Sequence, residues 1–146
     1  MAERTHHDDP YNLQRFVDAQ ERVYDHVCSE LRSGQKRSHW MWFIFPQIRG
    51  LGYSAISVKY SISSLEEAKA YLAHPILGPR LRECTRLVNE ICGRSIDDIF
   101  GDPDDMKFHS SVTLFAHATP DNQVFVDALE KYFRGEFDQL TLDRIR

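Results

Sequence analysis

The residues best suited to chemistry lie in one short stretch, residues 39–47, which holds both tryptophans of the chain. Four large aromatic side chains fall within six of its positions, and each can bury about 150–250 Å² of surface. Polar side chains are interleaved with them, and a glycine-flanked turn follows. This mixture predicts either a hydrophobic hub of the core or the wall of a ligand pocket. The candidate ligand contacts in this part of the chain are His39, Trp40, Trp42, Phe45, Pro46, Gln47, Gly50 and Gly52.

A second group of candidates lies on a helix predicted over residues 102–117. Spacings of three and four residues place Lys107, Ser110 and Ser111 on one face, and Thr113 lies near the neighbouring face. Ser and Thr compete with helical backbone hydrogen bonds, so a Ser-Ser-Val-Thr run is unfavourable in the middle of a helix. A ligand site explains this run, and so does back-bonding of the hydroxyls to the preceding turn. The sequence favours neither explanation.

Together the two segments predict a pocket for a small-molecule ligand. We expect that ligand to be anionic or nucleotide-like, because tryptophan can stack on a ring and Lys107 with Arg49 can hold a phosphate. Two other interpretations stay open. An exposed aromatic segment is typical of a protein-interaction module. A buried one is plain core, in which case function lies on a surface that no motif marks.

No established catalytic motif is present in the chain. It contains no glycine-rich phosphate loop and no HExxH, CxxC or GxSxG sequence. Asp105 and His109 stand one helical turn apart and form a candidate acid–base pair, although such a pair is more often a surface contact. No cofactor and no metal site is indicated, and the sequence leaves open whether the protein is an enzyme and which residues would be catalytic.

Composition narrows the class of protein. The length of 146 residues corresponds to a single domain. A net charge of −4 argues against general nucleic-acid binding, which depends on a broad basic surface. No signal sequence and no apolar run of the roughly 20 residues of a membrane span is evident, so no membrane association is expected. The three cysteines lack metal-ligand spacing and are predicted to be small buried side chains in a reducing compartment, which indicates a cytoplasmic protein. The oligomeric state is not indicated.

Apolar residues at three- and four-residue spacing predict a mainly α fold, a compact single-domain bundle of several helices. Residues 1–11 are expected to be a flexible tail, and residues 12–146 to form the domain. The predicted helix caps are Ser63 or Ser64, Ser95 and Asp102, the last with Pro103 at the first position of its helix. The predicted helical segments are 12–33, 64–73, 76–92, a short turn at 95–101, 102–117, an apolar stripe over 124–133 and a last turn at 140–145.

Residues 39–62 form the one segment that is rich in aromatic residues, glycine and serine and does not fit a helical pattern throughout. Apolar and polar residues alternate over 56–62, which is typical of a strand. A lone strand has no partner elsewhere in the sequence, so we predict an irregular segment. A short β-hairpin over residues 53–62 is the alternative.

The motifs resemble those of a bacterial family of unknown function whose members often carry the name calpastatin. The resemblance runs from about residue 12 to the end of the chain. It implies a small, mainly helical domain and little about its activity. The calpastatin name fits poorly, since this chain lacks the polar, low-complexity composition of a disordered inhibitor. The motifs that carry the resemblance are FVDAQ at 16–20, HWMWFIFPQ at 39–47, GLG at 50–52, YLAHPILG at 71–78, IFG at 99–101 and KFHSSVTLF at 107–115.

The chain is also similar to the helical NADAR domains, which are tied to ADP-ribose and related N-glycosidic chemistry. Those domains combine an aromatic segment with a helix bearing a lysine–phenylalanine step, here Lys107-Phe108. This similarity implies N-glycosidic chemistry as a further alternative function. Their other motifs are not found in order, so no catalytic residue is carried over to this sequence.

Overall fold

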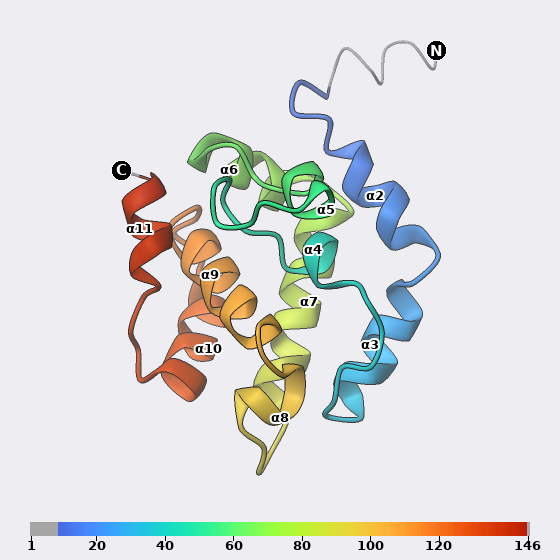
Figure 1. Ribbon diagram of the computed structural model, residues 1–146, viewed down its shortest axis with the longest axis vertical. Coiled ribbons are helices and arrows are strands. Elements are labelled where there is room, and N and C mark those ends of the chain that lie inside the picture. Colours follow the sequence, from blue (N-terminus) through green and yellow to red (C-terminus); the bar gives the residue numbers. More distant parts are fainter. Residues whose placement is uncertain (1–8, 146) are drawn as a thin grey trace.

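A computed structural model describes residues 9–145 of the chain, and over that range the fold is all-helical (Figure 1). The predicted mainly α fold is therefore confirmed. No β-strand forms between residues 9 and 145, where the backbone makes one isolated parallel bridge, from Ile48 to Ile62. The tail predicted for residues 1–11 falls largely outside the described residues. The helices are α2 (Gln14–Glu21), α3 (Tyr24–Arg32), α4 (Met41–Ile44), α5 (Ala55–Lys59), α6 (Leu65–Ala73), α7 (Leu77–Glu90), α8 (Ile96–Phe100), α9 (Asp104–Ala116), α10 (Gln123–Phe133) and α11 (Gln139–Ile145).

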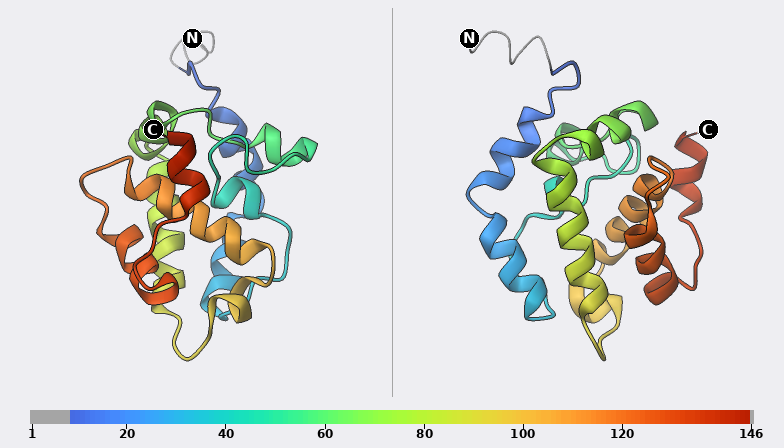
Figure 2. Two further views of the ribbon diagram at one scale, coloured as in Figure 1. Left: turned by 60° about the vertical axis from the view of Figure 1, so that its left-hand side comes forward. Right: turned by 180° about the vertical axis from the view of Figure 1, so that it is seen from behind.

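Helix α7 runs through the middle of the molecule, with α2 and α3 on one side and α9, α10 and α11 on the other (Figures 1 and 2). Helices α3, α6 and α10 pack directly on α7. Helix α9 packs against α6, α8, α10 and α11. The helix that carries the second group of candidate residues is thus held on several sides, which fixes the positions of its side chains.

Aromatic side chains from distant parts of the sequence form the centre of the core. The Phe45 ring meets Phe108 edge to face at 5.0 Å, and Phe100 lies 5.9 Å from Phe45. Edge-to-face pairs of this kind stabilise by about 0.5–1.5 kcal/mol beyond the burial of their surface. These contacts join the segment of α4 to α8 and α9. The largest fully buried side chains are Trp40, Tyr71, Phe16, Phe45, Phe108, Phe115 and Phe125.

The single long helix predicted over residues 12–33 is two helices, α2 and α3, with a break at residues 22–23. The two helices have different partners, since α2 packs on α4 and α3 packs on α7. Buried Gln20 holds the end of α2 in place: its amide donates to the Phe43 carbonyl at 2.7 Å and to the Tyr71 hydroxyl at 3.2 Å. The prediction was wrong here because the spacing of apolar residues continues through the break. That spacing does not show that α2 and α3 pack on different helices.

The hairpin considered for residues 53–62 is wrong, because residues 55–59 form the short helix α5 instead. The Ser54 hydroxyl caps this helix by accepting a hydrogen bond from the Ser57 amide. The alternation of apolar and polar residues misleads because the apolar side chains here are not all buried. Tyr53 is 87% and Val58 is 55% exposed. The rest of residues 39–62 is irregular, as predicted, apart from α4 and the Ile48–Ile62 bridge.

Other helix ends follow the local signals of the sequence. Ser64 caps α6, and Ser95 forms a capping box with Asp98 at the start of α8, as predicted. Helix α9 begins later than predicted, at Asp104, with Pro103 at the N-cap position after a cis Asp102–Pro103 peptide. No side chain caps α9, so the predicted role of Asp102 is wrong.

Two of the three cysteines are buried, as predicted. Cys28 and Cys84 belong to the core, where α3 and α7 pack together. Cys92 is exposed, contrary to prediction. It follows the end of α7, where the chain leaves the core.

Candidate functional site

Two aromatic residues of the 39–47 segment turn inward. Trp40 is 1% exposed and its indole Nε1 donates to the Glu30 carboxylate at 3.0 Å. Phe45 is fully buried against Phe100 and Phe108. The one-turn helix α4 lies between them and buries Met41 and Ile44 in the same direction. The structure therefore places Trp40 and Phe45 in the core and not on a pocket wall.

A cavity of about 210 Å³ opens where the chain after α4 meets α9 and the start of α11. We call it the Lys107 cavity. Four of the predicted ligand contacts line it together: Gln47 and Gly52 from the first segment, and Lys107 and Ser110 from α9. The two candidate segments thus meet at one cavity. Its complete lining is Gln47, Leu51, Gly52, Pro103, Met106, Lys107, His109, Ser110, Asp138 and Leu140.

Lys107 supplies the positive charge of this cavity. Its Nζ lies 4.9 Å from the centre of the Trp42 ring and 3.6 Å from Asp104 Oδ1. The same Asp104 carboxylate makes a closer ion pair with Lys36, whose Nζ is 2.8 Å from Oδ2. Two ammonium groups therefore share one carboxylate. Lys107 has three N–H donors, and this arrangement leaves it able to donate to a ligand.

Ser110 and Asp138 form a hydrogen-bonded pair on the cavity wall. The Ser110 hydroxyl lies 3.0 Å from Asp138 Oδ2 and 3.1 Å from the Met106 carbonyl. The same Asp138 oxygen accepts from the amide and the hydroxyl of Thr141, so Asp138 caps the first turn of α11. The buried hydroxyl of Ser110 thus lies between an acceptor of its own helix and the carboxylate that caps α11.

His109 lines the cavity with a fixed orientation. Its ring stacks on Phe133 at 4.0 Å, and its Nε2 lies 2.8 Å from the Glu136 carbonyl oxygen. The acid–base pair considered for His109 and Asp105 is not formed, because the Asp105 Oδ1 atom accepts from the Met106 amide instead. Burial raises the pKa of the Asp105 carboxyl above its ordinary value.

The other predicted contacts lie away from the cavity lining. His39 is exposed and Pro46 is buried, while half-buried Trp42 lies under the Lys107 ammonium group without lining the cavity. Ser111 and Thr113 are both fully buried; the Thr113 hydroxyl accepts from the Asp138 amide, and Ser111 Oγ has no hydrogen-bond partner among residues 9–145.

Gly50 lies beside the cavity rather than on it. Its φ of +101° belongs to the left-handed region, and the Arg144 guanidinium lies where a side chain at this position would begin. Arg144 Nη2 also donates to the Gly50 carbonyl at 3.4 Å. This contact links the loop that follows α4 to α11, two segments that both contribute residues to the cavity lining.

Several lining residues were not among the predicted contacts. Pro103 lies four residues before Lys107, and Met106 lies four residues before Ser110, so both share their helical face. Extending the predicted face toward the N-terminus of the helix would have included both residues. Asp138 and Leu140 come from the start of α11, and no motif in the sequence connects them with α9. Their place follows only from the packing of α11 on α9.

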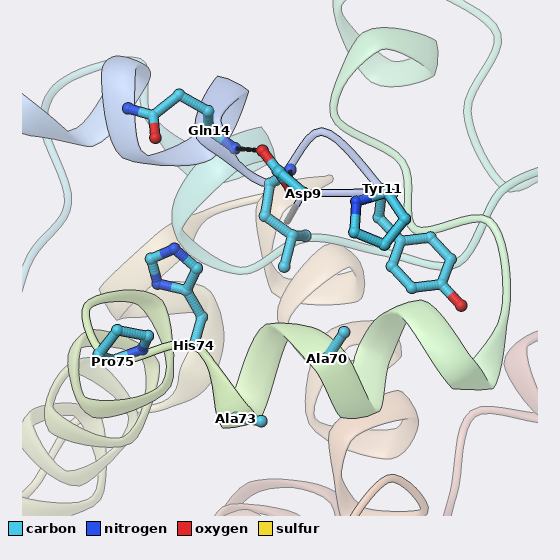
Figure 3. Close-up of a pocket in the computed structure, with 9 residues that line it drawn as sticks. Asp9, Tyr11, Gln14, Ala70, Ala73, His74 and Pro75 are labelled. Carbon is cyan, nitrogen blue, oxygen red and sulfur yellow. Dashed lines mark hydrogen bonds between the residues drawn. The ribbon is translucent and has the colours of Figure 1, made fainter. Parts of the chain in front are cut away.

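A larger cavity, of about 470 Å³, lies between the start of α2 and the corner of α6 and α7 (Figure 3). Two of its polar side chains, Asp9 and His74, already accept hydrogen bonds from backbone amides. Asp9 accepts from the amides of Leu13 and Gln14, and His74 Nδ1 accepts from the amides of Ile76 and Leu77. Burial lowers the pKa of His74. No lysine or arginine lines this cavity, so its residues are better explained as helix caps than as ligand contacts.

Neither a metal cluster nor a membrane span is found in the described part of the chain. Among residues 9–145, no group of three or more His, Cys, Asp or Glu side chains is arranged to hold a metal ion. None of the helices there combines the length and the apolar character that crossing a bilayer requires.

Comparison with known proteins places the chain in a family. The family model described as "Protein of unknown function (DUF1810)" matches residues 10–145. The chain belongs to the DUF1810 family. The predicted membership in a family of unknown function is thus confirmed at that level, while nothing in the DUF1810 match supports the calpastatin name.

A solved structure shows the same fold. The chain is 60% identical to the conserved hypothetical protein Rv1873 from Mycobacterium tuberculosis, with a TM-score of 0.93, over 94% of this chain and 98% of that one. No curated protein matches the chain significantly. The DUF1810 match and this structure establish family and fold, so the function has to be argued from the site.

Proposed function

We propose that this DUF1810 protein binds a small organic anion, a phosphate or carboxylate, in the Lys107 cavity. The observation that carries the proposal is the position of Lys107. Its ammonium group lies on the cavity wall and shares Asp104 with Lys36, which makes the closer ion pair. An anion in the cavity would accept charge-assisted hydrogen bonds from Lys107.

The size of the cavity limits the ligand. About 210 Å³ is below the roughly 300–1,000 Å³ of pockets that enclose drug-sized molecules. A whole nucleotide does not fit inside, so the enclosed part is a phosphate or carboxylate with a short organic group. Stacking of a base on Trp42 is also disfavoured, because the Lys107 ammonium already lies over that ring.

The alternatives have less support. Burial of Trp40 and Phe45 argues against a protein-interaction surface built on the 39–47 segment. N-glycosidic chemistry of the NADAR type has less support, since only one residue of the lysine–phenylalanine step reaches the cavity. Lys107 lines it, whereas Phe108 is buried in the core. A cytoplasmic location fits a protein that binds a metabolite and forms part of the proposal.

Replacing Lys107 by methionine is expected to weaken anion binding by about tenfold or more, because a hydrogen bond to a charged group contributes about 1.5–3 kcal/mol. Methionine keeps an apolar stem over Trp42. Ligands are found first by thermal shift, since a ligand of the folded state raises the apparent stability by RT ln(1 + [L]/Kd). The probes are inorganic phosphate, acetate, glycerol phosphate, AMP and ADP-ribose, with glycerol as the neutral control.

A matched control is Lys69→Met, which removes the same charge from an exposed position on α6. Its anion affinity is expected to equal that of the unmodified protein. The proposal fails if no anion raises the melting temperature, or if Lys107→Met and Lys69→Met bind the anion equally well.

A further inference from the structure

The hydrogen-bonding groups of the Lys107 cavity are of two kinds, donors and acceptors. Lys107 offers only donors. Three other lining residues, Ser110, His109 and Asp138, offer acceptors, and each is held by a contact inside the protein. These donors and acceptors specify which groups a ligand must carry.

Ser110 is an acceptor toward a ligand. A hydroxyl has one hydrogen, and both neighbours of Ser110 Oγ within the protein, Asp138 Oδ2 and the Met106 carbonyl, can only accept. The hydrogen is therefore directed at one of these two oxygens. Toward a ligand, the Ser110 oxygen can therefore only accept a hydrogen bond, through a lone pair.

His109 is an acceptor as well when its ring is neutral. The Glu136 carbonyl oxygen, 2.8 Å from Nε2, cannot donate, so Nε2 carries the proton. The other ring nitrogen, Nδ1, is then unprotonated. Stacking on Phe133 holds the ring in this orientation.

Asp138 completes the acceptor side and supplies its charge. Its Oδ2 atom receives hydrogen bonds from the amide and hydroxyl of Thr141 and lies 3.0 Å from the Ser110 hydroxyl oxygen. Within residues 9–145, Oδ1 receives none. The cavity thus carries one ammonium group, that of Lys107, and one carboxylate with an oxygen still able to accept.

We infer that the ligand of the Lys107 cavity is a small amino-substituted anion, a phosphate or carboxylate joined to an ammonium group by a short carbon chain. This inference rests on the proposed function. The anionic group lies at Lys107 and the ammonium group at Asp138 and Ser110, so that each charge meets its complement. Two exposed apolar side chains at the cavity, Met106 at 62% and Leu140 at 61%, suit the carbon chain between the charged groups.

The test compares 2-aminoethyl phosphate with ethyl phosphate and 2-hydroxyethyl phosphate by isothermal titration calorimetry. We expect 2-aminoethyl phosphate to bind about tenfold tighter than ethyl phosphate, with the hydroxyl compound between them, because only the ammonium group is both a donor and a cation. Asp138→Asn removes the charge and keeps a residue that caps helices well. It is expected to abolish the tenfold gain, so that 2-aminoethyl phosphate and ethyl phosphate bind this variant with equal affinity.

Two further variants keep the result interpretable. Ser110→Ala removes the second acceptor and is expected to reduce the gain without abolishing it, which provides a test if Asp138→Asn does not fold. Asp25→Asn, at an exposed position on α3, is the matched control and should keep the full gain.

The outcomes separate the two proposals. If ethyl phosphate binds in a Lys107-dependent way but the amino group adds nothing, the inference is overturned and the proposed anion site remains. The inference is also overturned if the gain persists in Asp138→Asn. If none of the three phosphates binds, the inference is overturned, and the proposed function fails as well only if acetate and the other probe anions do not raise the melting temperature.

Discussion

Gly78→Ala is expected to destabilise the protein by about 3 kcal/mol or more, because the new methyl group has no room. A Cβ at this position would lie 2.1 Å from the Leu72 carbonyl oxygen and 2.9 Å from its carbon. Both atoms belong to the backbone of α6, so relief requires moving α6 away from α7. Urea denaturation followed by circular dichroism measures the loss, and a variant that does not fold agrees with the prediction.

The matched control is Gly93→Ala. Gly93 has a φ of +73° but open space around it, so an alanine there adds only the strain of a left-handed residue, about 1 kcal/mol. Gly78 therefore has to be the costlier of the two sites by a wide margin. Equal losses at Gly78 and Gly93 would contradict the close helix contact.

Helix ends were predictable where the signal is local. Ser64 and Ser95 each accept a hydrogen bond from an amide three residues later, and this spacing is visible in the sequence. The break between α2 and α3 was not visible. It depends on where Gln20 finds its partners, the Phe43 carbonyl and the Tyr71 hydroxyl, and those residues are distant in the sequence.

The candidate site was predictable only in part, for a similar reason. A sequence motif identifies residues that are close together along the chain. Gln47 belongs to the motif at 39–47 and Lys107 to the motif at 107–115. A motif does not say which side of a segment faces the core. Trp40 illustrates this, because its burial depends on the Glu30 carboxylate ten residues earlier. Asp138 had no signal at all, since it reaches the cavity through the packing of α11 on α9.

Glu30→Gln is expected to cost about 3 kcal/mol at neutral pH, since Glu30 is a buried carboxylate that accepts four hydrogen bonds. The donors are the amides of Arg37 and Ser38, the Ser38 hydroxyl and the Trp40 indole, at 2.6–3.0 Å. A glutamine places an N–H group against some of these donors and leaves them unsatisfied. Glu130→Gln, at an exposed position on α10, is the matched control and is expected to change the free energy of unfolding by less than about 0.5 kcal/mol.

The pH dependence of this loss distinguishes charge from packing. Burial on its own raises the pKa of Glu30, but the hydrogen bonds from Ser38, Arg37 and Trp40 outweigh it and lower the pKa from 4.5 to about 2. The unfolded chain then binds more protons than the folded one between these values, so stability rises with pH there. The contribution of Glu30 is complete above pH 4.5, and it is lost as the pH falls through about 2.

The difference in unfolding free energy between the unmodified protein and Glu30→Gln should therefore shrink as the pH falls from 5 toward 2. Urea denaturation at a series of pH values measures it. A difference that stays constant over this range would assign the loss to changed packing around Trp40 and would contradict the stabilising role of the Glu30 charge. That role matters for the fold because Glu30 connects α3 to the chain leading into α4, and so holds Trp40 in the core.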